Sequence, residues 1–145
     1  MRILCIDHGE KRIGVALSDE TATIASPLAV IEHTSRTADA AQAAQLAAQH
    51  GAGRIIIGQS FDEDGFPNPA GRRAARFAEA LQAQTDLPIE LWDESFSTQD
   101  ARAARVQMGG TRKKRGGHQD ALAATVILQS YLEAKRQPNS SCPAS

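Results

Sequence analysis

Near the start of the chain, apolar and polar residues follow one another in a pattern that predicts three short strands. Two apolar runs, at 3–6 and 13–17, are joined by a polar turn. A third strand is expected from Thr23-Ile24 and 28–31, broken near Pro27 because proline cannot donate to a sheet ladder. These three strands should form an antiparallel meander.

After the meander, helical and strand periodicities alternate. Alanines at three- and four-residue spacing predict a first helix that ends at Gly51, and the β-branched run before Gly58 predicts a buried strand parallel to and beside the first one. Residues 59–69 hold turn-forming residues and are expected to be a loop. In chain order, the further predicted elements are helix 37–50, strand 54–58, helix 70–85, strand 89–92, helix 99–108 and helix 119–135.

This order of elements predicts an α/β fold with a mixed five-stranded sheet whose first three strands are antiparallel. We expect one domain over residues 1–136, because 145 residues are enough for one sizeable core. Residues 137–145 carry Pro, Asn and Ser with little to bury, and are predicted to be a disordered tail.

Composition narrows the classes of partner. With 16 basic and 17 acidic residues the net charge is −1, so any polyanion must be held by a local patch. The two cysteines, Cys5 and Cys142, have neither a disulfide framework nor metal-ligand spacing. No signal peptide or bilayer-long apolar run is present, so we expect a cytoplasmic protein with no membrane partner.

Three acids from distant parts of the chain are expected at one edge of the sheet. Asp7 ends the first strand, Glu94 or its neighbour Asp93 ends the last, and Asp120 opens the final helix. Ligands of open α/β sheets gather at the carboxyl ends of the strands, and carboxylate oxygens suit Mg²⁺ or Mn²⁺. Two such ions about 4 Å apart would suit phosphodiester cleavage, with Asp7 bridging them and Glu94 and Asp120 each holding one.

Each acid also has a purely structural interpretation. Asp7 could begin an Asx-type turn, with Gly9 and Gly14 letting the backbone turn closely. Asp120 could simply face the dipole of its helix, and Asp93-Glu94 could be a polar strand end of which at most one residue acts.

Basic residues offer a local site for phosphates. The run Arg112, Lys113, Lys114 and Arg115, expected in a mobile loop between glycine pairs, could neutralise backbone phosphates or form a solvated loop. His118 could be a general acid or base, a phosphate contact or a helix-start side chain. Further candidates for nucleic-acid contact are Lys11 and Arg12, and on the second helix Arg72, Arg73 and Arg76. Aromatic residues make up only 4%, which argues against a base-stacking platform.

Three motifs together resemble the YqgF, or RuvX-like, family of small bacterial RNase H-like proteins. They are the stretch Asp7–Asp19, the strand end 93–98, and Asp120-Ala121 after a basic, glycine-rich segment. The resemblance spans Arg2 to about Glu133. It implies an RNase H-like fold with helices on both faces of the sheet, and it implies that Asp7, Glu94 and Asp120 bind metal.

The chain departs from the family pattern at three places. Gln59-Ser60 stands where Leu-Pro is usual, Ser95 where an arginine is common, and His118 where a lysine usually lies. The last two departures remove positive charge beside the expected site.

The resemblance implies a metal-dependent nuclease that matures the 5′ end of pre-16S ribosomal RNA. The alternatives are a Holliday junction resolvase acting on branched DNA, which should be a dimer, and a protein that binds nucleic acid without cutting it. No dimer face is evident in the sequence, so a monomer or weak homodimer is expected. An ATP-binding relative of the fold would need a second lobe, for which 145 residues leave no room.

Overall fold

The computed structural model describes residues 1–96 and 116–136, with side chains for 1–95 and 121–135. The predicted helix 99–108, the basic run 112–115 and the predicted tail 137–145 lie outside the described residues. The elements, in chain order, are β1 (Arg2–His8), β2 (Arg12–Ser18), β3 (Ala25–Glu32), α1 (Arg36–Gln49), β4 (Ala52–Gln59), α2 (Pro69–Gln82), β5 (Ile89–Asp93), the short 3₁₀ helix η1 (Glu94–Phe96) and α4 (Gly116–Arg136).

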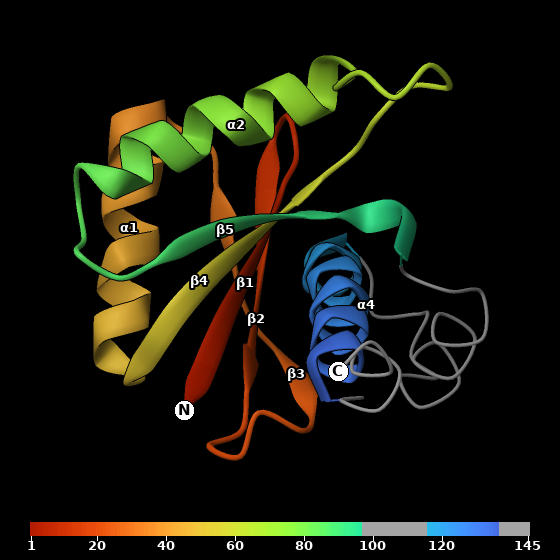
Figure 1. The fold of residues 1–145 in the computed structure, drawn as a ribbon. Helices are drawn as coiled ribbons and strands as arrows, with labels where there is room; N and C mark the ends of the chain where they lie inside the picture. The colour runs from red at the N-terminus through yellow and green to blue at the C-terminus, as the bar shows by residue number, and fades with distance from the viewer. Residues whose placement is uncertain (97–115, 137–145) are drawn as a thin grey trace.

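The five strands form one mixed sheet in the order β3-β2-β1-β4-β5, which confirms the predicted fold class (Figure 1). β2 pairs with β1 and β3 in antiparallel register, and β4 pairs with β1 and β5 in parallel register. β1 therefore lies in the centre of the sheet with a ladder on each side. Its carboxyl end lies at the same edge as those of β4 and β5.

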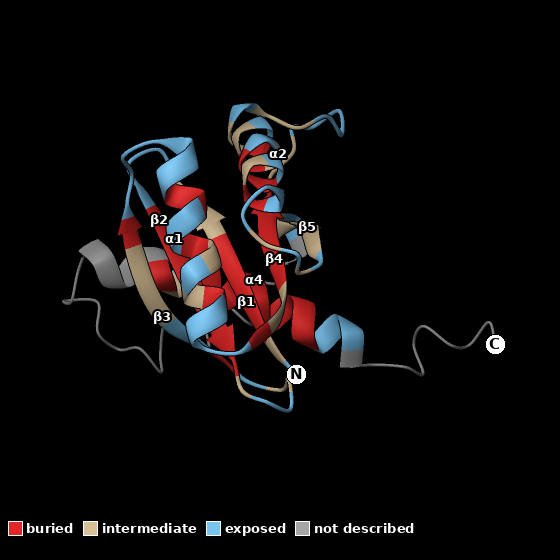
Figure 2. Cartoon of the chain, turned by 90° about the vertical axis from the view of Figure 1, so that its left-hand side faces the viewer, coloured by how far each residue is buried: buried red, intermediate tan, exposed pale blue. Residues whose placement is uncertain are grey.

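Helices cover both faces of the sheet, as expected (Figure 1). On one face, Leu4 and Ile6 of β1 pack in a core with Phe77 of α2 and the alanines of α1. On the other, Cys5 packs against Ile127 of α4. Figure 2 shows that the buried residues lie on the strands and on the helix faces turned to them. Because successive residues of a strand point to opposite faces, β1 serves both cores.

Local chemistry explains where the helices on the first face begin. The Ser35 hydroxyl accepts the Ala38 N–H at 3.1 Å and caps α1, and the Asn68 carbonyl oxygen accepts the Gly71 N–H at 2.8 Å and caps α2. Pro69 at the first turn of α2 has no N–H to leave unpaired.

The prediction of a break in the third strand was wrong. β3 is continuous from Ala25, and Pro27 lies within it opposite Ala16, where the register shifts. Proline is tolerated there because β3 is an edge strand. The pair Thr23-Ile24 lies before β3, and its backbone N–H groups instead donate to the Asp19 carboxylate at 2.8 and 3.1 Å.

The final helix begins earlier than predicted. α4 starts at Gly116, so the second glycine pair is helical and Asp120 is the fifth residue of the helix, beyond its first turn. The interpretation of Asp120 as a helix-dipole partner is weakened, since that effect fades after the first turn. Every residue from 124 to 132 is buried, as the apolar residues around the helix predict.

α4 is joined to β5 by a polar and aromatic contact. The Trp92 indole N–H donates to the Ser130 hydroxyl at 3.1 Å, and the Trp92 and Tyr131 rings meet edge to face at 5.0 Å. The Tyr131 hydroxyl donates to Glu90 at 2.8 Å, and Arg54 of β4 donates to the same carboxylate at 2.9 Å. These contacts fix where α4 lies relative to the end of β5. Within the described ranges, no helix is both long and apolar enough to cross a bilayer.

Candidate active site at the carboxyl edge of the sheet

Asp7 stands next to the last residue of the central strand and is half-buried. On one side its register partner is Gly14 of β2. On the other, the paired residues Ile6 and Ile57 place Gly58 of β4 next along the ladder. Glycines of the two neighbouring strands thus flank Asp7 on both sides.

The tight turn after Asp7 explains Gly9 without any ligand. The Gly9 N–H donates to the Arg12 carbonyl at 3.0 Å, and a Cβ at Gly9 would lie only 2.6 Å from that oxygen. The glycine is therefore needed for the backbone turn itself. Close approach of the turn to a metal or phosphate is not required to account for it.

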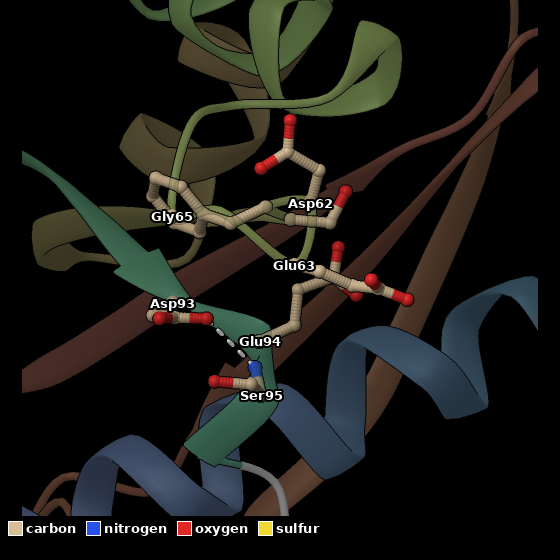
Figure 3. Close-up of a pocket in the computed structure, with 8 residues that line it drawn as sticks. Asp62, Glu63, Gly65, Asp93, Glu94 and Ser95 are labelled. Carbon is tan, nitrogen blue, oxygen red and sulfur yellow. Dashed lines mark hydrogen bonds between the residues drawn. The ribbon is translucent and has the colours of Figure 1, made fainter.

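Glu94 follows β5 directly and begins η1. Its Cγ lies 3.8 Å from the position a Cβ would take on Gly58, and that position is also within 2.9 Å of Ile127 Cδ1. Glu94 therefore lies between the end of β4 and α4. Asp93 leaves the strand in a different direction (Figure 3), and its carboxylate accepts the Ser95 N–H at 2.9 Å. Of the two acids that the strand pattern left open, Glu94, the one that the family resemblance implies, lies on the α4 side.

Asp7 and Glu94 both act electrostatically on the same buried side chain, Cys5. Burial raises the pKa of the Cys5 thiol well above its usual value, and the negative charges of Asp7 and then Glu94 raise the pKa further. Cys5 is fully buried beneath α4, two residues before Asp7 on the same face of β1. The end of β1 and the end of β5 thus present two carboxylates above one buried side chain.

The backbone of α4 carries position 120 toward the same edge. The Lys135 Nζ atom lies 4.0 Å from Glu90 Oε2, the Tyr131 ring contacts Trp92, and Ile127 lies beside Gly58. Going back along α4, successive contacts therefore move toward the carboxyl ends of β4 and β5. Position 120 shares a helical stripe with Ile127 and lies about 10 Å before it along the axis. The side chains of Asp120 and His118 lie outside the described residues.

A pocket of about 520 Å³ opens beside Glu94 (Figure 3). Its far wall is the loop after β4, which contributes Asp62 and Glu63. Asp62 accepts the N–H groups of Asp64 and Phe66 at 2.9 and 3.0 Å, so it mainly closes its own loop. Sequence analysis placed these acids in a loop and did not assign them to the site, although their position directly after a parallel strand was a usable signal.

These pocket acids do not form a metal site among themselves. Over the side chains that the structure describes, no three His, Cys, Asp or Glu residues lie close enough to hold an ion. The expected three-acid site therefore depends on Asp120, whose side chain is not among them.

The departure at Gln59-Ser60 has a structural explanation. The Gln59 amide donates to the Gly71 carbonyl at 3.1 Å, and the Ser60 hydroxyl donates to the Asn68 side chain at 2.8 Å. Both side chains thus hold the start of α2 against the end of β4.

The predicted nucleic-acid contacts are only partly described. Lys11 and Arg12 are exposed and lie in and just after the β1–β2 turn, at the same edge as Asp7. The Lys11 carbonyl accepts the His33 N–H at 3.0 Å, which ties this turn to the end of β3.

A mixed sheet whose central strand pairs antiparallel with one neighbour and parallel with the other, covered by helices on both faces, is the RNase H-like fold found in resolvases. Thermus thermophilus RuvC in complex with a Holliday junction substrate matches with a TM-score of 0.60 at 15% identity, covering 92% of this chain and 96% of that one. The fowlpox virus resolvase in complex with Holliday junction DNA gives 0.57 at 14% identity, covering 94% and 99%. At these identities the likeness concerns the fold.

The chain belongs to the RuvX family, described as Holliday junction resolvase, whose sequence model matches residues 1–134. A relative from Syntrophus aciditrophicus is 39% identical over 99% of this chain and 98% of its own length. One from Symbiobacterium thermophilum is 39% identical over 97% and 99%. Both are named "Putative pre-16S rRNA nuclease". The family expected from the sequence motifs is confirmed, and it supports an enzyme of the nuclease class.

Proposed function

We propose that this protein is a divalent-metal-dependent nuclease that hydrolyses phosphodiester bonds during 5′-end processing of pre-16S ribosomal RNA. The observation that carries the proposal is that Asp7 lies at the end of β1 and Glu94 directly after β5, beside Gly58 and near Ile127 of α4, so that both acids lie at the same edge of the sheet. The proposed substrate, pre-16S ribosomal RNA, is taken from the names of the relatives.

The residues at this edge fit a hard cation. Carboxylate oxygens are the ligands that Mg²⁺ and Mn²⁺ prefer, and a cation relieves the repulsion between clustered carboxylates. Asp7 and Glu94 would hold the ion, and Asp120 would complete the set from α4. When bound, one or two such ions would activate a water and stabilise the leaving oxygen.

Positive residues around the acids would hold the polymer. Lys11 and Arg12 on the turn after Asp7, together with His118 and the run Arg112, Lys113, Lys114 and Arg115, would contact backbone phosphates. A cytoplasmic location and a monomeric or weakly dimeric state remain part of the proposal.

The test is cleavage of a pre-16S RNA fragment in Mg²⁺ or Mn²⁺ by the protein and by its Asp7→Asn, Glu94→Gln and Asp120→Asn variants. Each variant should lose at least about 100-fold in rate, because removing a ligating charge weakens the metal site. Asp93→Asn is the matched control: it removes a neighbouring charge but keeps an acceptor for the Ser95 N–H. Cleavage undiminished in Asp7→Asn would contradict the proposal.

Metal binding has its own measurement. Mn²⁺ should raise the melting temperature Tm of the wild type and of Asp93→Asn, because a ligand that binds only the folded state stabilises it. It should leave the Tm of Asp7→Asn nearly unchanged. An equal rise in all three proteins would place the ion elsewhere.

The second candidate is a Holliday junction resolvase, which the description of the family model favours. It predicts symmetric cutting of a four-way DNA junction by a tight dimer, with the RNA fragment left intact. If all three acid variants keep full nucleic-acid affinity and biological activity, the protein binds without cutting.

A further inference from the structure

A second pocket lies at the same edge of the sheet but on the opposite face, under α1 and α2. It has a volume of about 300 Å³ and is lined by residues from four separate segments. His8 comes from the end of β1, His33 from the end of β3, Arg36 from the start of α1, and Arg73 and Arg76 from α2. The remaining lining residues are Glu10 and Ser35.

The lining of this pocket, which we call the arginine pocket, is strongly biased toward hydrogen-bond donors and positive charge. Three arginines face a single carboxylate, Glu10, whose oxygen lies 3.8 Å from Arg73 Nη1. Glu10 is itself largely exposed, with 75% of its side chain accessible, so it screens the arginines weakly. The pocket therefore keeps a net positive charge.

Buried nitrogen atoms in the wall lack partners. His8 Nδ1 and Arg73 Nε are both shielded from solvent and have no hydrogen-bond partner in the part of the chain that the structure describes. His8 is fixed by its ring contact with Phe77, at 4.8 Å between ring centres. Nearly all buried polar groups in proteins are satisfied, so an unpaired Arg73 N–H and an unpaired His8 ring nitrogen beside a cationic pocket indicate a missing polar ligand.

The acid behind the pocket does not supply that ligand. Asp39 of α1 is fully buried, but its two oxygens already accept from the His33 ring at 2.5 Å and from the Thr34 backbone N–H at 3.1 Å. This contact holds the His33 ring near the amino-terminal end of α1. The amino-terminal end of α1, at Ser35 and Arg36, adds a partial positive charge at the same place.

We propose that the arginine pocket binds a phosphate group of the nucleic-acid backbone, so that one strand passing over the end of β1 meets the carboxylates on one face and the arginines on the other. Consecutive residues of β1 make this possible, because Asp7 points to the α4 side and His8 to the α1–α2 side. The identification of the polymer as RNA rests on the proposed function. The inference that the pocket binds phosphate rests on the pocket residues alone.

The experiment measures binding of a labelled single-stranded RNA by fluorescence anisotropy, with every variant made in the Asp7→Asn background so that cleavage does not interfere. Arg76→Gln and Arg36→Gln should each weaken binding about fivefold at 0.1 M salt and lower the salt slope by about 0.7, as expected for one lost phosphate contact. Arg72→Gln is the matched control. Sequence analysis grouped Arg72 with Arg73 and Arg76 as a candidate nucleic-acid contact, but the Arg72 guanidinium donates to the Pro67 carbonyl and does not line the pocket. Arg72→Gln therefore makes the same charge change on α2, outside the pocket.

A gain-of-binding variant guards against misfolding as an explanation. Glu10→Gln removes the one acid of the lining and should tighten RNA binding about two- to fivefold. Inorganic phosphate should compete with RNA for the parent protein more effectively than for Arg76→Gln.

Measuring the variants with RNAs that carry or lack a 5′-terminal phosphate distinguishes a backbone phosphate from a terminal one. Equal losses for both RNAs indicate a backbone phosphate, and a loss confined to the phosphorylated RNA indicates a terminal one. The proposal is overturned if Arg76→Gln, Arg36→Gln and Glu10→Gln all bind like Arg72→Gln. If the wild type cuts RNA normally while these variants bind normally, only the pocket assignment fails; if they lose binding but the wild type cuts nothing, only the nuclease assignment fails.

Discussion

Gly58 is the position at which packing between β4 and α4 can be tested most sharply. A Cβ there would lie 2.9 Å from Ile127 Cδ1 and 3.5 Å from Ile127 Cγ2, whereas carbon atoms in contact prefer about 3.5–4.0 Å. Gly58→Ala therefore forces Ile127 to move within a closely packed layer, which costs about 1–3 kcal/mol. The backbone at Gly58 is not left-handed, so the loss of unfolded-state entropy returns about 0.4–1 kcal/mol.

We expect Gly58→Ala to lower the free energy of unfolding by about 1–2 kcal/mol, equivalent to a fall in Tm of about 3–8 °C. Guanidinium unfolding, followed by circular dichroism and by the fluorescence of Trp92, measures this. Trp92 is the only tryptophan and lies opposite Gly58 in the sheet, so it reports on this region. Gly53→Ala is the control at the other end of β4, where the new methyl group meets only the flexible side chain of Met1, itself 61% exposed.

The double variant tests the cause. Ile127→Val removes the Cδ1 atom and alone should cost about 0.5–1.5 kcal/mol. Combined with Gly58→Ala, the new methyl group occupies the vacated space, so the double variant should be about as stable as Ile127→Val alone. Losses that add to within about 0.5 kcal/mol would refute the packing argument. The contact with Glu94 Cγ at 3.8 Å is an ordinary one, so cleavage activity should change little in any variant that remains folded.

Three further predictions concern groups with defined surroundings. Burial and a hydrogen bond to a carboxylate raise the pKa of Tyr131, the only tyrosine, to about 12, so absorbance at 295 nm should titrate near pH 12 in the folded protein and near 10 in guanidinium. The free energy of unfolding should accordingly fall as pH rises from 10 to 12. A midpoint near 10 in the folded protein would contradict this prediction. Hydrogen bonds from the Thr21 hydroxyl and from the Thr23 and Ile24 N–H groups lower the pKa of Asp19 to about 2. Asp19→Ala should therefore lower Tm at pH 7, and the difference from the wild type should shrink as pH falls through 2. A difference independent of pH would contradict a stabilising role of the Asp19 carboxylate. In a Cys142→Ser variant, the fully buried Cys5 should react with a thiol reagent only on unfolding, and rapid reaction of the native protein would contradict its burial.

Sequence alone predicted most of the architecture because each element carries its own signal. The β-branched run before Gly58 and the helical spacing of Phe77 and Leu81 predicted their elements, and the parallel neighbour of β1 was correctly expected. The start of α4 was missed because two glycines, poor helix formers, begin it. Tertiary context overrides helix propensity at such positions, and the local sequence pattern does not indicate that the helix begins there.

The candidate site was predictable in part for the same reason. Asp7 and Glu94 end strands, so topology alone brings them to one edge. The strand pattern could not choose between Glu94 and Asp93, because the choice depends on which way each side chain leaves the strand, and only the family motif indicated Glu94. Nor could it find the arginine pocket: His8 and Arg73 are distant in sequence and meet only because β1 and α2 pack on the same face.

The alternation of Asp7 and His8 at the end of the central strand bears on which changes in chain length the protein can accept. Inserting or deleting one residue within β1 would exchange the two side chains between the faces of the sheet, turning the acid toward the arginines and the imidazole toward Glu94. Restoring them would require β1 to slip against ladders on both sides at once, one antiparallel and one parallel. The loop from Phe61 to Pro67 has no such constraint. Natural length variation among relatives should therefore gather in that loop and be absent from β1.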